Sequence, residues 1–147
     1  MAVAPFPVAS TWFHSTEMDP EVLAANIALA TDPTGVVPAG QAEFWFSDSW
    51  YASRYYGPNT VRATLQLINP LYVTVEQQKE ARIGPSSGWA RRAREAGHDS
   101  VIIHDIMDGD AYSTICAIFD PSLAEVVPHS KWNENNQDFD LISPITA

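Results

Sequence analysis

Cysteine is almost missing from this chain of 147 residues, because Cys116 is the single one. One cysteine excludes an internal disulfide and any zinc site built on cysteine. Long apolar runs are missing too, and none reaches the roughly 18 residues that a membrane span needs. The opening decapeptide, MAVAPFPVAS, has two prolines and no basic residue, so we expect no secretory signal there. These features predict a single-domain protein of a reducing compartment, the cytoplasm.

Basic residues are scarce. Eight lysines and arginines stand against 18 aspartates and glutamates, which gives a net charge of −10. Five of the eight bases lie between Lys79 and Arg94, whereas Asp99 to Asp140 contains nine acids and only Lys131. Such a field repels nucleic acid and attracts basic proteins, so we expect no direct nucleic-acid binding. The alternative is that the acid excess serves solubility alone.

Several catalytic motifs are also missing. The sequence has no GxGxxG, no phosphate loop with Gly-Lys-Ser, no HExxH and no GxSxG. The four histidines do not have metal-ligand spacing; they are His14, His98, His104 and His129. A metal enzyme or a nucleoside triphosphatase is therefore disfavoured, and we expect no metal site.

The most informative stretch is FWFSDSWYASRYYG, residues 44–57. An apolar strand should end there on a polar cluster, and a helix should begin at about Trp50, capped by one of residues 47–49. Tyr51 and Tyr55 are one helical turn apart and share a face. The aromatic rings suit either a protein core or the wall of a ligand pocket, and the sequence leaves both open.

Cap and turn residues predict the other elements. A helix should begin at Asp19-Pro20-Glu21 and run to about Ala30, because aspartate caps it and proline suits its first position. Asp108-Gly109 predicts a tight turn. Further strands are expected at residues 10–14, 61–67, 71–75, 101–103 and 113–119, and a further helix at 89–96. Loops or polar segments are expected at 31–42, 77–88 and 120–136, before a tail at 139–145 whose docking stays open.

Five strings follow one another in a recognisable order: FHST, FSDSWYASRYY, LQLINPLYV, AREAGHDSVII and STICAIFDPS. In this order the chain resembles the ADP-ribosyltransferase-like domains of phage and other mobile-element proteins. The resemblance extends from Trp12 to Phe119 at least. It implies an α+β fold of two packed, mainly antiparallel sheets with flanking helices. The whole chain, 1–147, would be one such domain, with 130–147 as the tail.

The resemblance also implies roles for individual residues. His14 would hold a ribose hydroxyl of NAD, the co-substrate, and the backbone of Ser15 and Thr16 would hold the nicotinamide amide. Ser47 and Asp48 match the Thr-Asp of the family and would also belong to the NAD site. Tyr55 matches its helix tyrosine and would stack on nicotinamide, so we expect His14 and Tyr55 on opposite walls of one cleft.

A carboxylate is also expected, because positive charge develops on the ribose as the glycosidic bond breaks. The Glu or Gln that many such transferases carry before the last strand has no counterpart in Ser113-Thr114-Ile115. Asp105, Asp108 and Asp110 are the nearest acids that could replace it. Asp105 directly follows a predicted strand and is favoured, with Asp108 and His14 completing the catalytic group. The alternative for Asp108 is a purely structural turn residue.

The function implied by the resemblance is that of an NAD-dependent mono-ADP-ribosyltransferase. Its target would be a basic or nucleic-acid-binding host protein, because the surface is acidic. Two alternatives remain open at this level. The chain could be an acidic interaction protein or inhibitor that masks a basic surface without catalysis, or an NAD glycohydrolase with water as the acceptor.

Overall fold

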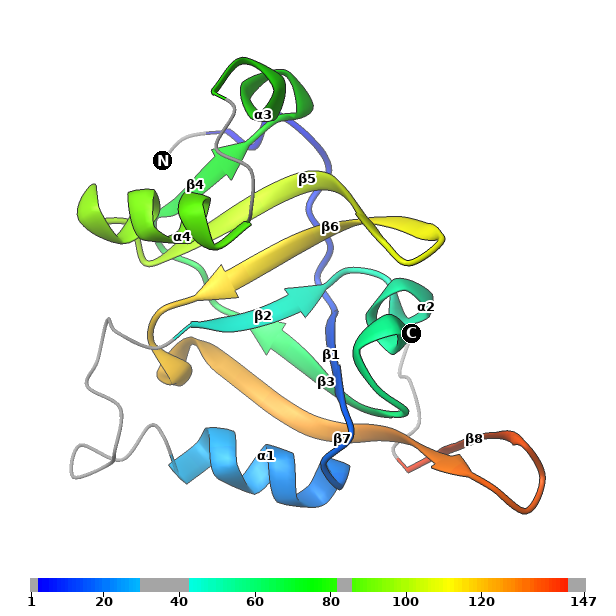
Figure 1. Cartoon of the computed structure of the whole chain (residues 1–147). Coiled ribbons are helices and arrows are strands. Elements are labelled where there is room, and N and C mark those ends of the chain that lie inside the picture. The colour runs from blue at the N-terminus through cyan, green and yellow to red at the C-terminus, as the bar shows by residue number, and fades with distance from the viewer. Residues whose placement is uncertain (1–2, 30–42, 82–85, 143–147) are drawn as a thin grey trace.

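A computed structural model of the chain describes residues 3–29, 43–81 and 86–142 (Figure 1). Within these ranges it has eight strands, four α-helices and two short 3-10 helices. The strands are β1 (Trp12–Thr16), β2 (Phe44–Ser47), β3 (Asn59–Leu65), β4 (Pro70–Val73), β5 (Ser100–Asp108), β6 (Ala111–Ile118), β7 (Ala124–Asn133) and β8 (Asp138–Leu141). The helices are α1 (Pro20–Leu29), α2 (Trp50–Ser53), η1 (Arg54–Tyr56), α3 (Val75–Ala81), α4 (Ser86–Glu95) and η2 (Pro121–Leu123).

All described strands belong to one sheet, in the order β4-β5-β6-β2-β1-β3-β7-β8. Only β4 and β5 pair in parallel, so the α+β class and the mainly antiparallel pairing are as expected. The expectation of two packed sheets is wrong, because β1 and β2 join the two four-stranded halves into one sheet. That junction consists of a single pair, Phe13 opposite Ser47. We call it the seam.

Two apolar clusters pack on opposite faces of the sheet around β5 and β6, and the second extends across the seam to Trp12 and Ala63. On one face, Trp89, Ala90 and Ala93 of α4 lie against Val101 and Ile103. The other cluster is formed by Phe6, Trp12, Phe46, Ala63, Ile102, Cys116 and Ile118. Because β5 and β6 are covered on both faces, their sequences are continuous apolar runs rather than alternating ones. In the other half, α1 lies along β7 and β3 (Figure 1).

The two capped helix starts that the sequence predicts are confirmed, whereas the helix expected at 89–96 begins earlier, at Ser86. The Asp19 carboxylate accepts a hydrogen bond from the Glu21 backbone N–H (2.9 Å), directly before α1. The Ser49 hydroxyl accepts one from the Ala52 N–H (3.2 Å) at the start of α2. The predicted helix end at Ala30, the loop at 31–42 and the last residues of the tail lie outside the described residues.

Three expectations about the elements are wrong. First, β1 continues to Thr16, so His14 lies within the strand and not at its end. Second, α3 occupies part of the segment expected to be an irregular polar one. It begins with a capping box, in which the Gln77 N–H donates to the Thr74 hydroxyl (3.2 Å) and the Thr74 N–H donates to the Gln77 side chain (2.8 Å).

The third error concerns residues 120–136, which were expected to be rich in turns. They include β7, which pairs with β3 on one side and with β8 on the other. The pairing with β3 shifts between Thr60 and Val61, so that His129 lies in a bulge beside Pro128. A bulge tolerates a proline that cannot donate to the ladder. The expected tail contributes β8, which is paired along its length with the end of β7.

No helix in the described ranges combines the length and the apolar character needed to cross a membrane.

Candidate functional site

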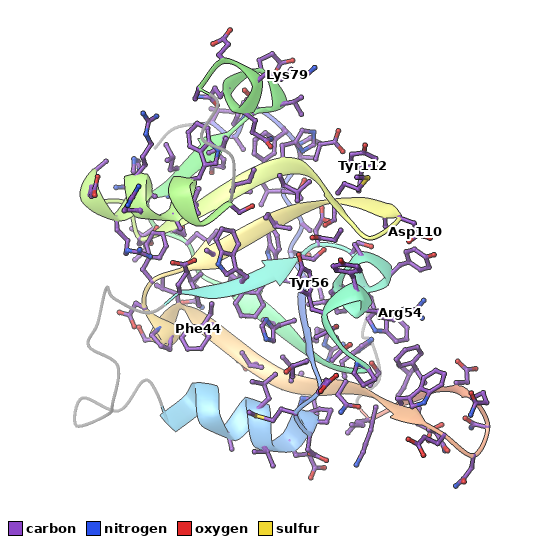
Figure 2. All side chains as sticks on the ribbon, in the orientation of Figure 1. Phe44, Arg54, Tyr56, Lys79, Asp110 and Tyr112 are labelled. Carbon is purple, nitrogen blue, oxygen red and sulfur yellow. The ribbon has the colours of Figure 1, made fainter. Side chains whose placement is uncertain are left out.

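A pocket of about 470 Å³ opens beside the seam, where β1 and β2 part. Its walls come from β1, β2, the α2–η1 segment, the β5–β6 hairpin and the first residue of α4. They consist of Phe13, His14, Ser15, Thr16, Trp45, Phe46, Ser47, Ser53, Tyr56, Ser86, Ile106, Asp108 and Ile115. Figure 2 shows Tyr56 of η1 in the central part of the molecule, and Asp110 and Tyr112 on the hairpin. The volume is within the range of small-molecule sites.

His14 has a defined orientation. Its Nδ1 lies 2.6 Å from the carbonyl oxygen of Trp45 across the seam. A carbonyl oxygen only accepts hydrogen bonds, so Nδ1 carries the proton, and Nε2 of the neutral ring is left as an acceptor. The ring also packs edge-on against Phe46, with centroids 5.9 Å apart. His14 can therefore accept a hydrogen bond from a ligand hydroxyl.

The Ser15 side chain belongs to a closed ring of hydrogen bonds under the pocket, which we call the hydroxyl ring. The Trp50 indole N–H donates to Thr60 Oγ1 (3.3 Å), and Ser53 Oγ donates to the Trp50 carbonyl oxygen (3.1 Å). Ser15 Oγ lies 2.7 Å from both Thr60 Oγ1 and Ser53 Oγ. Ser53 gives its single proton to Trp50, so Ser53 must accept a hydrogen bond from Ser15. Ser15 then has no proton left for Thr60 and must accept from the Thr60 hydroxyl. Because its proton is used here, the Ser15 hydroxyl cannot donate a hydrogen bond to a ligand.

Asp108 and Tyr56 form the polar pair of the pocket. The Tyr56 hydroxyl donates a hydrogen bond to Asp108 Oδ1. Although Tyr56 is 59% exposed as a whole, partial desolvation raises the pKa of its hydroxyl, and the hydrogen bond to Asp108 and the charge of its carboxylate add to this effect. Tyr56 therefore stays protonated and holds one carboxylate oxygen, while Asp108 is only 6% exposed. Among the described lining residues, Asp108 is the single carboxylate.

Tyr55 does not line the pocket, although the sequence places it there. It is 66% exposed and packs over the turn of the β5–β6 hairpin, where a Cβ on Gly109 would lie 2.7 Å from its ring. The helix tightens into a 3-10 turn after Ser53, and residues three apart then share a face. Tyr56 therefore follows Ser53 into the pocket, which α-helical spacing through residues 50–56 does not predict.

The end of this turn is held close to β1. A Cβ on Gly57 would lie 2.3 Å from the carbonyl carbon of Thr16, so only glycine permits the contact. Thr16 and Tyr56 consequently line the same end of the pocket.

Asp105, the favoured acid, does not line this pocket. It is exposed, and its φ of 62° belongs to the irregularity in β5 between Ile103 and Ile106. Such a bulge re-aims a side chain, which strand alternation could not predict. Asp110 also lies outside and accepts a hydrogen bond from the Tyr51 hydroxyl (3.1 Å).

Asp48 has a structural position beside the pocket. Its carboxylate accepts a hydrogen bond from the Thr114 N–H (3.0 Å), while its own N–H donates to the Thr114 carbonyl oxygen (3.0 Å). Burial raises the pKa of Asp48. The neighbouring Ser47 does line the pocket, and its hydroxyl bonds Ser113 Oγ (2.8 Å). Asp48 therefore joins the end of β2 to β6 and positions Ser47.

The pocket combines aromatic walls, hydroxyls, one histidine and one carboxylate. No described lysine or arginine lines it. The site suits an apolar ring attached to a sugar, with positive charge near Asp108. In the part of the chain that the structure describes, no group of three His, Cys, Asp or Glu residues could hold a metal ion.

Compared with protein-family models and with curated proteins, the chain matches none of them.

Proposed function

We propose that this protein is an NAD-dependent ADP-ribosyltransferase that modifies a basic protein. The observation that carries the proposal is that His14, Tyr56 and Asp108 line one pocket at the seam. The nicotinamide riboside end of NAD fits the chemistry of these walls, and its diphosphate would lie toward solvent. The resemblance of the five sequence strings to such domains supports the same reading.

Each residue has a role that its contacts allow. His14 Nε2 accepts a hydrogen bond from a ribose hydroxyl, because Nδ1 already donates to Trp45. Asp108 faces the ribose carbon on which positive charge develops, and Tyr56 keeps its carboxylate in place. A preorganised carboxylate stabilises that charge more in the transition state than in the ground state. Asp108 thus replaces Asp105 as the proposed acid.

The transfer requires no reactant other than NAD and a nucleophile of the target protein. The bond between the ribose carbon and the nicotinamide nitrogen breaks, and both electrons leave with nicotinamide. A nucleophile of the target protein forms the new bond to that carbon and releases a proton to water. Water in place of the target would make the same site an NAD glycohydrolase.

NAD binding is the first test. NAD at millimolar concentration should raise the melting temperature, because a ligand that binds only the native state stabilises it. His14→Ala should abolish the shift. His98→Ala is the matched control, since His98 also bonds a backbone carbonyl oxygen, that of Asn69 (3.1 Å), but does not line the pocket. A wild-type melting curve unaffected by NAD would remove the basis of the proposal.

Labelled NAD separates the remaining functions. Incubation with a cell lysate should give a labelled protein band if the chain is a transferase. Free ADP-ribose without a band would indicate a glycohydrolase. NAD binding with neither product would indicate a binding or inhibitory protein.

A further inference from the structure

A row of aromatic side chains with one arginine among them runs from the pocket to the β7–β8 hairpin. We call it the aromatic ridge, and it consists of Tyr55, Tyr51, Arg54, Phe139 and Trp132. The Arg54 guanidinium carbon lies 5.0 Å from the Tyr51 ring centre and 4.8 Å from that of Phe139. The Phe139 and Trp132 rings are 5.0 Å apart. Figure 2 shows Arg54 between the tip of the β5–β6 hairpin and β8.

The ridge begins at the mouth of the pocket. The ring of Tyr55 lies 5.2 Å from that of Tyr56, which lines the pocket. Tyr51 and Tyr55 are 57% and 66% exposed, which is high for aromatic rings in a protein whose core is otherwise well covered. A protein segment that reached the pocket from this side would cross both rings.

Charge decides what kind of segment the ridge suits. Exposed carboxylates flank both ends: Asp110, which holds the Tyr51 hydroxyl, and then Glu134, Asp138 and Asp140 on the β7–β8 hairpin. Lys131, a cation on β7, is already paired with Asp19 (3.1 Å). Single-stranded nucleic acid also stacks on aromatic rings, but it requires a cationic groove, and these acids would repel it.

Exposed tyrosine faces attract cations, and guanidinium groups in particular stack on them. Arg54 shows that the rings of this ridge accept a guanidinium. Nearby carboxylates strengthen the attraction and can pair with the same groups. We infer that the aromatic ridge docks an arginine-bearing segment of the protein substrate. As a statement about the substrate, this inference rests on the proposed function.

Peptide binding without NAD tests the ridge separately from catalysis. The probe is a fluorescein-labelled dodecapeptide of alternating arginine and glycine, with a lysine–glycine peptide for comparison, measured by fluorescence anisotropy. Tyr51→Ser should weaken binding of the arginine peptide about twofold to fivefold, as expected for an exposed cation–π contact. Tyr51→Phe keeps the ring and should bind as the wild type does.

Two matched controls separate the ridge from general effects. Tyr112 is 63% exposed but pairs with Met107 on the face of the hairpin opposite Asp108, so Tyr112→Ser should leave binding unchanged. The double variant Glu134→Gln/Asp138→Asn should weaken binding and reduce its dependence on salt. The same charge change on α3, Glu76→Gln/Glu80→Gln, should have less than half that effect.

Several results would overturn the inference. One is that the wild type does not bind the arginine peptide at millimolar concentration. Another is that Tyr51→Ser and Tyr112→Ser lose the same affinity for this peptide. A third is that the wild type binds labelled oligothymidylate more tightly than the peptide. If the peptide fails to bind while NAD still shifts the melting curve and labels a protein, only the ridge is refuted. If the peptide binds on the ridge while NAD has no effect, the proposed function falls and the docking surface remains.

Discussion

The hydroxyl ring beneath the pocket gives a stability prediction that does not depend on function. Ser15→Ala removes the hydroxyl that bridges Thr60 and Ser53, through two contacts of 2.7 Å each. Each lost hydrogen bond costs about 1 kcal/mol net. Thr60, which has no exposed surface, is also left with a hydroxyl proton that has lost its acceptor. Such a buried donor adds roughly 1–3 kcal/mol, so the free energy of unfolding should fall by about 3–5 kcal/mol.

Urea unfolding followed by tryptophan fluorescence measures this loss. The double variant Ser15→Ala/Ser53→Ala should lose clearly less than the sum of the two single losses, because either substitution already opens the ring. Ser122→Ala is the control: Ser122 is exposed, and the change should stay within about 0.5 kcal/mol. A loss below about 1 kcal/mol in Ser15→Ala, or strictly additive single effects, would refute the closed ring.

Two further predictions concern Asp108 and His129. Asp108→Asn should reduce the rate of ADP-ribose transfer about 100-fold to 1,000-fold with little effect on NAD binding. Asp105→Asn is the control and should keep full activity, because asparagine tolerates the positive φ at this position. Equal activity of the two variants would contradict the assignment of Asp108. His129 is fully buried, and burial, aided by the charge of Arg62, lowers its pKa below 6.5. The neutral ring is therefore favoured in the fold, and stability should fall by up to about 1.4 kcal/mol per pH unit below pH 6.5. In His129→Phe, the free energy of unfolding measured in urea should fall less between pH 7 and pH 5 than it does in the wild type. An equal fall in the two proteins would show that His129 is not the cause of the pH dependence.

Local signals in the sequence predicted much of the fold. The cap and proline at Asp19-Pro20, the serine before Trp50 and the Asp108-Gly109 turn each act within a few residues, and each is where it was expected. The capping box at Thr74 was equally local and was simply overlooked. By contrast, β7 could not be predicted from its polar composition, because its place depends on pairing with two distant strands.

The site was predictable only in part, for geometric reasons. His14, Ser15, Thr16 and Ser47, which the resemblance assigns to the site, lie on the regular strands β1 and β2, and the structure brings them to one pocket. Tyr55 and Asp105 are displaced from it by two small irregularities, a 3-10 turn and a bulge. Each changes the direction of a side chain without changing the composition of the segment. Such one-residue shifts decide which tyrosine and which aspartate face a ligand.

The seam has a consequence for how the molecule comes apart. The strands of its two halves alternate along the chain: β1 and β3 belong to one half, β2 and β4 to the other. A single cut or truncation therefore cannot release either half as an independent folding unit. The two halves share only one described residue pair beside the pocket, but the chain passes repeatedly from one half to the other and so connects them. The apolar cluster that joins Trp12 and Ala63 to Phe46 and Ile102 also spans the seam, so the two halves share a core as well as a chain.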